Sequence, residues 1–439
     1  MSETALAVAG FGVLLMLIAA RLHVGLAMMV TGAAGYVWLS SWPAFLAYMK
    51  TNSYHQFANY TLSVIPLFIL MGALAEESGL SKKLFRAAAH VVGRFRGGLA
   101  YAVVASCAGF GAICGSSVAT TATFGRAALP ELERYRYDGG FATGVIAVGG
   151  TLGILVPPSV ILVVYAIATE QNIAKLFMAA LVPGLLAAIF YSVTIYLVVW
   201  RRPDLGPPSP AVDHEGTWRV VAAAWPALAV ALVVVGGIYG GVFTPTEGAA
   251  VGVAAMFAIG LGQRALGWSE LRRALLQTAS TTGMIFIILL GSEVFNAFLA
   301  LSQLPASLSS WIGAMNLPPY AVLAALLACY ILLGAVMDEL AMLLLTLPVF
   351  FPVVAGLDFG LPGEEQAIWF GVLVLVVVGM GLTAPPIGLN VFVVSAIAAR
   401  TPIAETYRGV LPFLAADIVR LGVLMAFPVL ALGMVRWLG

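Results

Sequence analysis

"GGTLGILVPPSVILVV", residues 149–164, has the apolar character of a membrane-spanning helix but carries Pro157 and Pro158 at its centre. Proline lacks an N–H and disfavours a helical conformation in the residue before it, so the pair must interrupt the helix. Non-helical backbone is tolerated at membrane depth only where protein or a water-filled cavity surrounds it, because unsatisfied backbone groups are costly in hydrocarbon. The stretch therefore predicts a broken span that lines a polar site.

The composition places this break in an all-α polytopic membrane protein. Of the 439 residues, 62% are hydrophobic and 9% are charged, and many apolar stretches reach the roughly 20 residues needed to cross a bilayer. The first of them follows an acidic start and lacks a clear cleavage motif, so we expect a retained span rather than a signal peptide. The expected spans lie near residues 4–20, 24–40, 58–77, 139–168, 176–200, 218–241, 246–262, 280–300, 365–399 and 410–435.

Two further apolar stretches, 97–130 and 318–354, have small or polar residues at their midpoints, "GAICGSSVATT" and "GAVMDELAM". This pattern favours re-entrant helical hairpins, which enter and leave the membrane on one side. Two ordinary crossings in each stretch are the alternative.

The broken span occurs twice. "GMGLTAPPIGLNVFVV", residues 379–394, repeats the glycine-rich approach, the proline pair (Pro385 and Pro386) and the apolar exit. Other matching segments are also separated by about 220 to 230 residues, so the two halves are predicted to be copies. Five spans and one hairpin in each half make the second copy inverted relative to the first, and paired, interrupted spans in inverted repeats point to a transporter's binding site.

The basic residues predict the orientation, because Lys and Arg are enriched on the cytoplasmic side. With the N-terminus outside, Arg21, the cluster 82–96 and most later arginines fall inside, whereas Lys50, Lys175 and Arg436 fall outside. Both termini are then periplasmic. The expected units are scaffold spans 1–79, an interfacial arm helix 80–96, a transport half 97–200, an inter-repeat loop 201–217, scaffold spans with a second arm helix (267–279) within 218–317, and a second transport half 318–439.

The breaks and hairpin tips are the candidate site. A broken helix presents carbonyl oxygens, which suit a hard cation such as Na⁺, and a half-helix N-terminus, which suits a carboxylate. The hairpin tips add Gly115, Ser116, Ser117, Thr120 and Thr121 in one half and Gly334 and Asp338 in the other. Packing between membrane helices is the alternative role of such small residues.

Acidic residues in or beside spans are functional candidates by default. Asp338 is the strongest because it lies at a hairpin tip. We expect Glu247 to cap a helix, Glu339 to face water and Asp417 to pair with Arg420, and Glu293 stays open. An intramembrane protease using Asp338 is a minor alternative, because no matching motif supplies a second acid.

Other chemistries are disfavoured. The three cysteines and four histidines match no metal or disulfide framework, and the phosphate-binding G-x-x-x-x-G-K-[ST] pattern does not occur. We therefore expect no enzyme and no ATP hydrolysis by this chain.

Taken together, "GAICGSSVATTATFGRAALPEL", "GGTLGILVPPSVILVVYA", "GVFTPTEGAAVG" and "GMGLTAPPIGLNVF" resemble the large membrane subunit of a TRAP (tripartite ATP-independent periplasmic) transporter. The resemblance covers nearly the whole chain. It implies an elevator-type transporter in the cytoplasmic membrane of a bacterium or archaeon, driven by a Na⁺ gradient. It also implies a small four-helix membrane subunit and a periplasmic binding protein that delivers an organic acid. A self-sufficient Na⁺/dicarboxylate symporter is the nearest alternative.

The resemblance also implies site residues. The substrate would contact Ser116, Ser117, Thr120, Pro158, Pro386 and Asn390. Co-transported Na⁺ would contact Ser116, Gly153, Pro157, Gly334, Asp338, Thr383 and Pro385. The first break has Leu155 and Val156 where the second has Thr383 and Ala384, so it must rely more on backbone oxygens.

Overall fold

The computed structural model describes residues 3–208, 220 and 222–438, and regular structure in this part of the chain is entirely helical. The first half contains α1 (Glu3–Ala19), α2 (Val24–Leu39), α3 (Trp42–Phe57), η1 (Tyr60–Ser63), α4 (Val64–Glu77), α5 (Leu80–Val92), α6 (Gly98–Cys114), α7 (Ser117–Arg134), α8 (Gly139–Leu155), α9 (Val160–Ala168), α10 (Ile173–Arg201) and η2 (Pro203–Leu205). The second contains α12 (Trp225–Tyr239), α13 (Pro245–Gly262), α14 (Trp268–Leu301), α15 (Leu304–Ala314), α16 (Pro319–Gly334), α17 (Glu339–Ala355), α18 (Gly363–Gly381), α19 (Leu389–Ile397), α20 (Ile403–Ala426) and α21 (Val429–Leu438).

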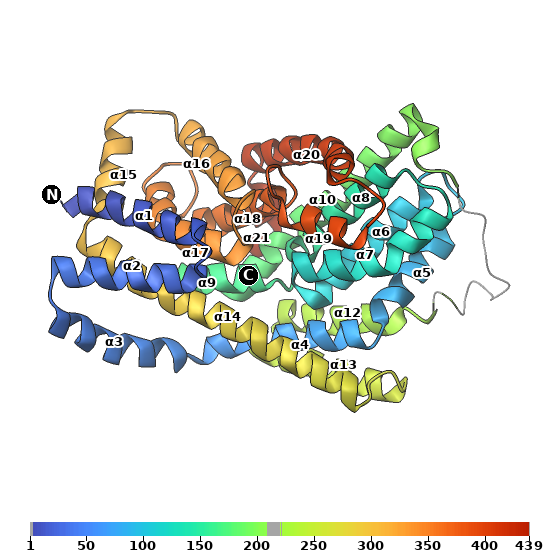
Figure 1. The fold of residues 1–439 in the computed structure, drawn as a ribbon, viewed down its shortest axis with the longest axis horizontal. Helices are drawn as coiled ribbons and strands as arrows, with labels where there is room; N and C mark the ends of the chain where they lie inside the picture. The colour runs from blue at the N-terminus through green and yellow to red at the C-terminus, as the bar shows by residue number, and fades with distance from the viewer. Residues whose placement is uncertain (1–2, 209–219, 221, 439) are drawn as a thin grey trace.

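Both halves follow one order of elements in their C-terminal parts: a pair of helices, a broken helix and a long helix. These are α6–α7, α8–α9 and α10 in the first half and α16–α17, α18–α19 and α20 in the second. Figure 1 shows α6–α7 toward one end of the long axis and α16–α17 toward the other. Six of the described helices are long and apolar enough to cross a membrane, and α8 with α9, bent by 46° at the prolines, makes a seventh.

Two expected segments differ from the structure, and a third lies partly outside the described residues. The expected arm helix 267–279 and the following span form one helix, α14, because no Pro or Gly interrupts residues 268–282. The expected span 410–435 is divided, since α20 ends at Ala426 before Pro428, which cannot continue a helix. Residues 209–217 of the expected loop 201–217 lie outside the described part of the chain. Residues 218, 219 and 221 at the start of the expected span 218–241 also lie outside it.

The expected capping role of Glu247 is confirmed. Its amide donates to the Thr244 hydroxyl oxygen (3.3 Å), and its carboxylate accepts from the Thr244 amide (2.8 Å). This reciprocal pair satisfies two backbone donors at the start of α13, which Pro245 opens.

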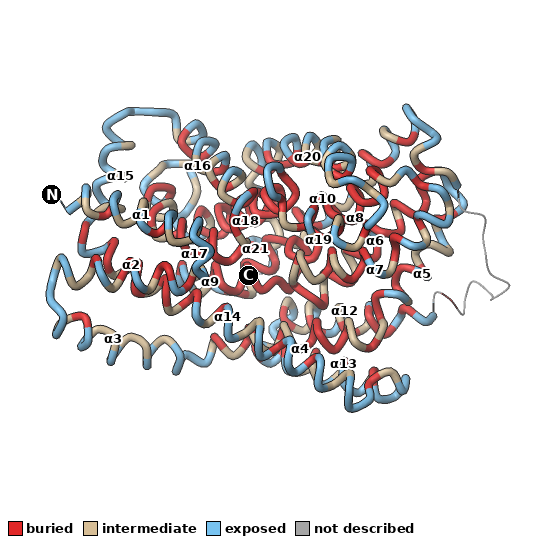
Figure 2. The backbone as a smooth tube through the Cα atoms, in the orientation of Figure 1, coloured by how far each residue is buried: buried red, intermediate tan, exposed pale blue. Residues whose placement is uncertain are grey.

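The broken helices form the interior of the molecule. Nearly every residue of α8 and α18 is buried, whereas α3, α13 and α20 carry exposed faces (Figure 2). A helix that is apolar on all sides belongs in such a position. Buried hydrogen-bonding groups at the breaks therefore have to find partners inside the protein.

Helices α8 and α20 approach until their backbones touch. A Cβ atom on Gly409 would lie 1.9 Å from the Gly140 carbonyl oxygen, and one on Gly144 would lie 2.6 Å from the Gly409 carbonyl carbon. The hydroxyls of Thr143 and Thr406 meet at 2.9 Å in the same contact. Small residues and hydroxyl pairs of this kind join membrane helices without a hydrophobic driving force.

The expected pairing of Asp417 with Arg420 is also confirmed, deep inside the molecule. The Arg420 Nη2 lies 2.9 Å from Asp417 Oδ1, and both residues are 1% exposed. The Tyr191 hydroxyl donates to Asp417 Oδ2 (3.0 Å) and meets the Thr151 hydroxyl at 3.0 Å. This network joins α8, α10 and α20.

Asp417→Asn should lower the free energy of unfolding by about 3–5 kcal/mol, because it leaves the buried Arg420 charge uncompensated. Thermal unfolding in detergent measures the loss. The matched control is Glu365→Gln, which breaks the exposed pair with Arg436 and should change the unfolding temperature little. The double variant Asp417→Leu/Arg420→Met should recover most of the loss. Equal losses of unfolding temperature in Asp417→Asn and Glu365→Gln would contradict this account.

Candidate functional site

The tip of the first hairpin rests on the first proline break. The Gly115 carbonyl oxygen accepts a hydrogen bond from the Val160 amide (3.4 Å), the first residue of α9. Gly115 has a φ of +64°, and a Cβ atom there would lie 2.9 Å from the Pro158 carbonyl oxygen. Only glycine fits both the left-handed conformation and the close approach.

The second hairpin meets the second break in the same way. The Ala335 carbonyl oxygen accepts from the amides of Ile387 and Gly388, both at 3.1 Å. Just before this contact, Gly334 packs against the backbone of Gly381, where a Cβ atom would lie 2.8–3.2 Å from Cα atoms. Each hairpin thus supplies a backbone carbonyl oxygen to amides that the prolines leave unpaired. Both Pro-Pro peptide bonds are cis.

Asn390 joins the second break to the first hairpin. Its Nδ2 donates to the Ser117 hydroxyl oxygen (2.7 Å) and to the Ala147 carbonyl oxygen of α8 (3.1 Å). Its side-chain oxygen is buried, and no hydrogen-bond partner for it exists among the described residues. A buried, unpaired amide oxygen is a ready ligand for a cation.

Ser116 and Asp338 occupy equivalent positions in the two hairpins. Each is the N-cap of the second helix: Ser116 accepts from the Ala119 amide (3.4 Å), and Asp338 accepts from the amides of Leu340 (3.1 Å) and Ala341 (3.4 Å). The cap sets the side-chain oxygen at the tip of each hairpin.

One cavity of about 360 Å³ brings the two tips together. Ser116 and Asp338 line it, and the facing wall consists of α4 and α14, including Glu76 and Gln277. The cavity therefore lies between the two hairpins on one side and helices α4 and α14 on the other. The volume suits a small polar ligand.

The cavity contains both signs of charge. Arg126 of α7 is its sole Lys or Arg among the described residues, and its Nη2 lies 2.6 Å from the Glu76 carboxylate. Glu339 corrects our expectation that it faces water: it is 7% exposed and lines the cavity. The reason is that Asp338 takes the capping position, so that Glu339 begins α17 inside the protein. Its Oε2 has no hydrogen-bond partner in the described chain.

The remaining expected site residues are not among those that line the cavity. Gly153 packs against the first tip, where a Cβ atom would lie 2.4 Å from the Thr120 hydroxyl oxygen and 2.6 Å from the Ser116 carbonyl oxygen. The Thr383 hydroxyl donates to the Met380 carbonyl oxygen (3.0 Å). The prolines differ between halves: Pro157 and Pro158 are buried, whereas Pro385 and Pro386 are exposed.

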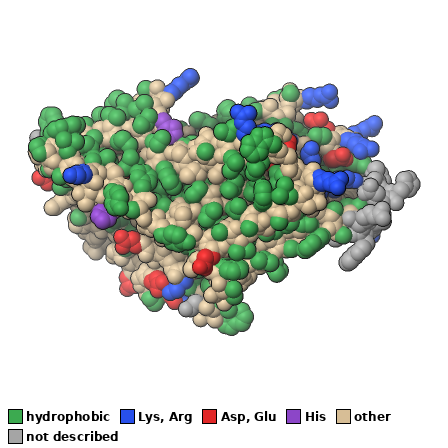
Figure 3. Space-filling view, turned by 90° about the horizontal axis from the view of Figure 1, so that it is seen from below, with side chains coloured by type: hydrophobic (Ala, Val, Ile, Leu, Met, Phe, Trp, Pro, Cys, Tyr) green, Lys and Arg blue, Asp and Glu red, His purple; other side chains and the backbone are tan. Residues whose placement is uncertain are grey.

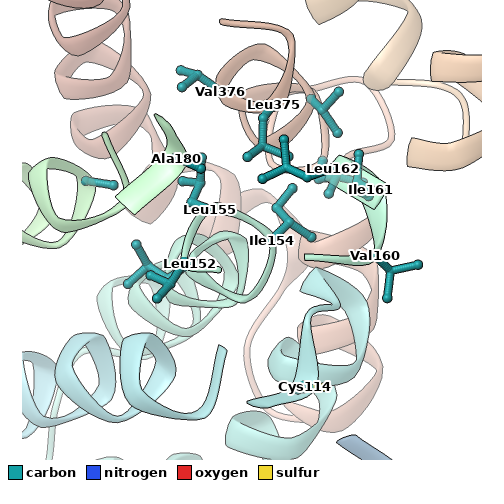
Figure 4. Packing of buried hydrophobic residues seen from close by; sticks show 14 of the residues in the cluster. Cys114, Leu152, Ile154, Leu155, Val160, Ile161, Leu162, Ala180, Leu375 and Val376 are labelled. Carbon is teal, nitrogen blue, oxygen red and sulfur yellow. The ribbon is translucent and has the colours of Figure 1, made fainter. Parts of the chain in front are cut away.

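Apolar packing holds the first break in place. Ile154 before the prolines and Ile161 and Leu162 after them are buried and gather beside Leu375 of α18 (Figure 4). The two broken helices thus support one another across the interior.

Glu293 lies in a different cavity, of about 600 Å³, which α3, α9, α14 and α17 enclose. The Tyr48 hydroxyl donates to its Oε1 (3.2 Å). The structure therefore does not bring Glu293 to the hairpin tips.

Sequence reasoning missed Arg126, Glu76 and Ser159. Arg126 lies inside the apolar stretch 97–130, and an ionisable residue there is itself a functional signal. Ser159 directly follows the first proline pair, and its buried hydroxyl has no hydrogen-bond partner in the described residues. Its position at the start of the second half-helix was the available signal, and for Glu76 the signal was an acid at the end of the expected span 58–77.

Comparisons with known proteins agree on one family. The family model described as tripartite ATP-independent periplasmic transporter, DctM component, matches residues 11–430. The C4-dicarboxylate TRAP transporter large permease protein DctM of Pseudomonas aeruginosa is 37% identical over 384 residues, 87% of each chain. The sialic acid TRAP transporter large permease protein SiaM of Vibrio cholerae is 30% identical over 373 residues, 84% of this chain and 85% of that one.

Among solved structures, the chain resembles the Alcanivorax borkumensis YdaH transporter. The TM-score is 0.60 over 89% of each chain, at 16% sequence identity. At this identity the likeness concerns the fold alone.

Gly153→Ala should push the first hairpin tip away from the break, since its methyl group would overlap Thr120 and Ser116. We expect faster amide hydrogen exchange at residues 114–121 and a loss of about 1–3 kcal/mol in unfolding free energy. The matched control is Gly379→Ala in the other broken helix, where the Cβ atom would make an ordinary 3.4 Å contact. Similar exchange in the two variants would mean that Gly153 does not hold the tip.

Proposed function

The chain belongs to the family of DctM components, the large membrane subunits of TRAP transporters, and from this premise we propose that it imports a small organic acid together with Na⁺ by an elevator mechanism. The observation that carries the proposal is the cavity that both hairpin tips share, with Arg126 and Asp338 in its wall. A dicarboxylate, sialic acid or similar carboxylate is the proposed substrate class. Two relatives bear the names of a C4-dicarboxylate and a sialic acid permease.

Family membership makes this a multi-pass membrane protein and favours a permease over an intramembrane protease. The proposed partners are a small four-helix membrane subunit and a periplasmic substrate-binding protein, because the family name describes a transporter of three parts. The proposed location is the cytoplasmic membrane with both termini in the periplasm. Uptake that needs no binding protein would instead favour a self-sufficient symporter.

Co-transport of Na⁺ is supported by the ligand atoms that meet at the tips and breaks. Carboxylate, amide and backbone carbonyl oxygens suit hard cations. Asp338 supplies a carboxylate at the cavity wall, and Asn390 and Ser159 supply buried side-chain oxygens without partners in the described chain. We propose that Na⁺ travels as cargo beside the substrate.

Uptake by the reconstituted chain with its partners should depend on Na⁺ with a Hill coefficient above one. Asp338→Asn should raise the Na⁺ concentration for half-maximal uptake about tenfold or more, since a bond to a charged oxygen is worth roughly 1.5–3 kcal/mol. The matched control is Asp358→Asn, an exposed aspartate that also accepts from a backbone amide, at 2.8 Å. Equal uptake driven by a proton gradient in Na⁺-free buffer would contradict Na⁺ coupling.

Arg126 is the proposed anchor for the substrate carboxylate. Its side chain lines the cavity and is 57% exposed, and its ion-pair partner Glu76 belongs to the facing helix α4. A substrate carboxylate can replace Glu76 because both are planar groups that an arginine binds through two N–H donors. Release of Glu76 would then loosen the hairpin from α4 when substrate binds.

Arg126→Gln should raise KM for the carboxylate substrate at least tenfold and leave the Na⁺ dependence nearly unchanged. Arg126→Lys should be intermediate, because lysine lacks the two-pronged geometry. Arg134→Gln on the same helix is the control, since Arg134 is exposed and lies 3.8 Å from Glu131, outside the cavity. An unaltered KM in Arg126→Gln would exclude this role.

Movement of the hairpins against a frame is supported by how the helices pack. Helices α2 and α14 touch through their backbones, with a Cβ atom on Gly25 or Gly32 only 2.7 Å from backbone atoms of α14. The hairpins contact α4 and α14 less closely: a Cβ atom on Gly72 of α4 would lie 3.0 Å from Cys114 Cα, and a cavity lies between the tips and these two helices. The two hairpins lie toward opposite ends of the molecule (Figure 1), which fits an inverted repeat. In an inverted repeat, the two halves can exchange conformations, and this exchange opens the binding site to the other side of the membrane.

A disulfide between Ser292→Cys and Leu344→Cys should stop uptake reversibly. The Ser292 hydroxyl donates to the Leu344 carbonyl oxygen (3.1 Å), so the two positions join α14 of the frame to the second hairpin. Reductant should restore uptake, and each single cysteine variant should remain active. Full uptake by quantitatively cross-linked protein would contradict the elevator mechanism.

A further inference from the structure

A third cavity, of about 790 Å³, lies outside the transport site. It is enclosed by the start of α8, the end of α10 and the first half of α20. Its residues take no part in the tips or breaks described above, and this inference does not depend on the identity of the transported substrate.

Three arginines line one end of this cavity: Arg201, Arg202 and Arg408. All three are exposed, and none forms an ion pair with a carboxylate of the described residues. Two acids share the lining. Asp138 accepts the Phe141 amide as a helix cap (2.9 Å), and Glu405 is exposed. The cavity therefore has a surplus of positive charge without internal partners.

The rest of the lining is largely apolar. Leu197 and Val198 of α10 lie one helical turn before Arg201 and Arg202, and Pro412, Ala416 and Val419 of α20 follow Arg408. Leu197 and Val419 are exposed, at 45% and 59%, which suits contact with hydrocarbon in a membrane protein. A cationic end that continues into an apolar groove matches an amphiphile with an anionic head and long hydrocarbon chains.

The position of the cavity along the chain agrees with this chemistry. The end of α10 and the start of α20 are on the side that carries the excess of Lys and Arg, and basic side chains gather at the right-hand end of the face in Figure 3. That side is the expected cytoplasmic leaflet, which is rich in anionic lipids. Guanidinium groups bind phosphate oxygens through paired donors.

We propose that this cavity binds one anionic phospholipid, with its phosphate held by Arg201, Arg202 and Arg408 and its acyl chains along α10 and α20. These helices are the long helices of the two halves, and Tyr191 and Asp417 already join them deeper in the interior. The lipid adds a contact between the same two helices near their cytoplasmic ends. Bound lipid should therefore stabilise the protein.

The test uses the full-length chain, purified in detergent and stripped of lipid. It is titrated with phosphatidylglycerol or with phosphatidylcholine of the same acyl chains, and bound lipid is counted by native mass spectrometry. Phosphatidylglycerol should bind more tightly and raise the unfolding temperature. Arg201→Gln with Arg408→Gln should weaken its binding about 30-fold, because each basic residue near an anionic lipid contributes about a factor of five.

The matched control is Arg264→Gln with Arg272→Gln, which removes the same charge from exposed arginines outside the cavity. It should retain the preference for phosphatidylglycerol. Equal binding of both lipids by the native chain, or an unchanged preference in Arg201→Gln/Arg408→Gln, would overturn the proposal.

A second measurement locates the lipid. Trp200 is exposed and directly precedes Arg201. In vesicles, brominated phosphatidylglycerol should quench tryptophan fluorescence more than brominated phosphatidylcholine, and Trp200→Phe should remove this difference. A difference that survives Trp200→Phe would place the anionic lipid elsewhere and contradict the proposed site.

Discussion

A backbone interrupted inside a membrane protein must find its hydrogen-bond partners within the protein, and the architecture follows from this constraint. Each proline pair frees amides and carbonyls in the middle of an apolar helix. A carbonyl oxygen from a hairpin tip meets those amides: Gly115 reaches Val160, and Ala335 reaches Ile387 and Gly388. A hairpin that ended elsewhere would leave the break unsatisfied, so the break and the tip must occur together in each half.

The same contacts place polar oxygens where a ligand can reach them. Because each tip must end against a break, the capping residues Ser116 and Asp338 come to line one cavity. The helices behind them are held by backbone-to-backbone packing and by the buried Asp417–Arg420 pair. A rigid interior thus supports a polar surface, which is the arrangement that a selective binding site requires.

Two ion pairs, one buried and one partly exposed, have different consequences. Asp417 and Arg420 belong to one helix and lie fully within the interior, and the hydrogen bond from Tyr191 to Asp417 links this pair in α20 to α10. Arg126 and Glu76 belong to different parts of the molecule and face a cavity. An ion pair that water and ligands can reach is worth little by itself and can be exchanged. This difference separates a structural pair from a candidate recognition pair.

The sequence by itself determined the local features of this protein. Apolar stretches of bilayer length, two proline pairs 228 residues apart (385 minus 157) and polar hairpin midpoints predicted the helices, the breaks and the tip residues Ser116 and Asp338, whereas Asn390 was implied only by the family resemblance. Caps such as Thr244–Glu247 and the Asp417–Arg420 pair were predictable because their partners are three residues apart. These features depend on helix period and proline geometry, which operate over a few residues.

Only the tertiary structure decided which of these residues meet. Glu76 and Arg126 are 50 residues apart, and Ser117 and Asn390 are 273 apart, so no local pattern could pair them. The burial of Glu339 and the exposure of Pro385 also depend on which helix lies opposite. Long-range packing sets these contacts. A helix satisfies its backbone hydrogen bonds internally, so the side chains on its surface determine which helix packs against it.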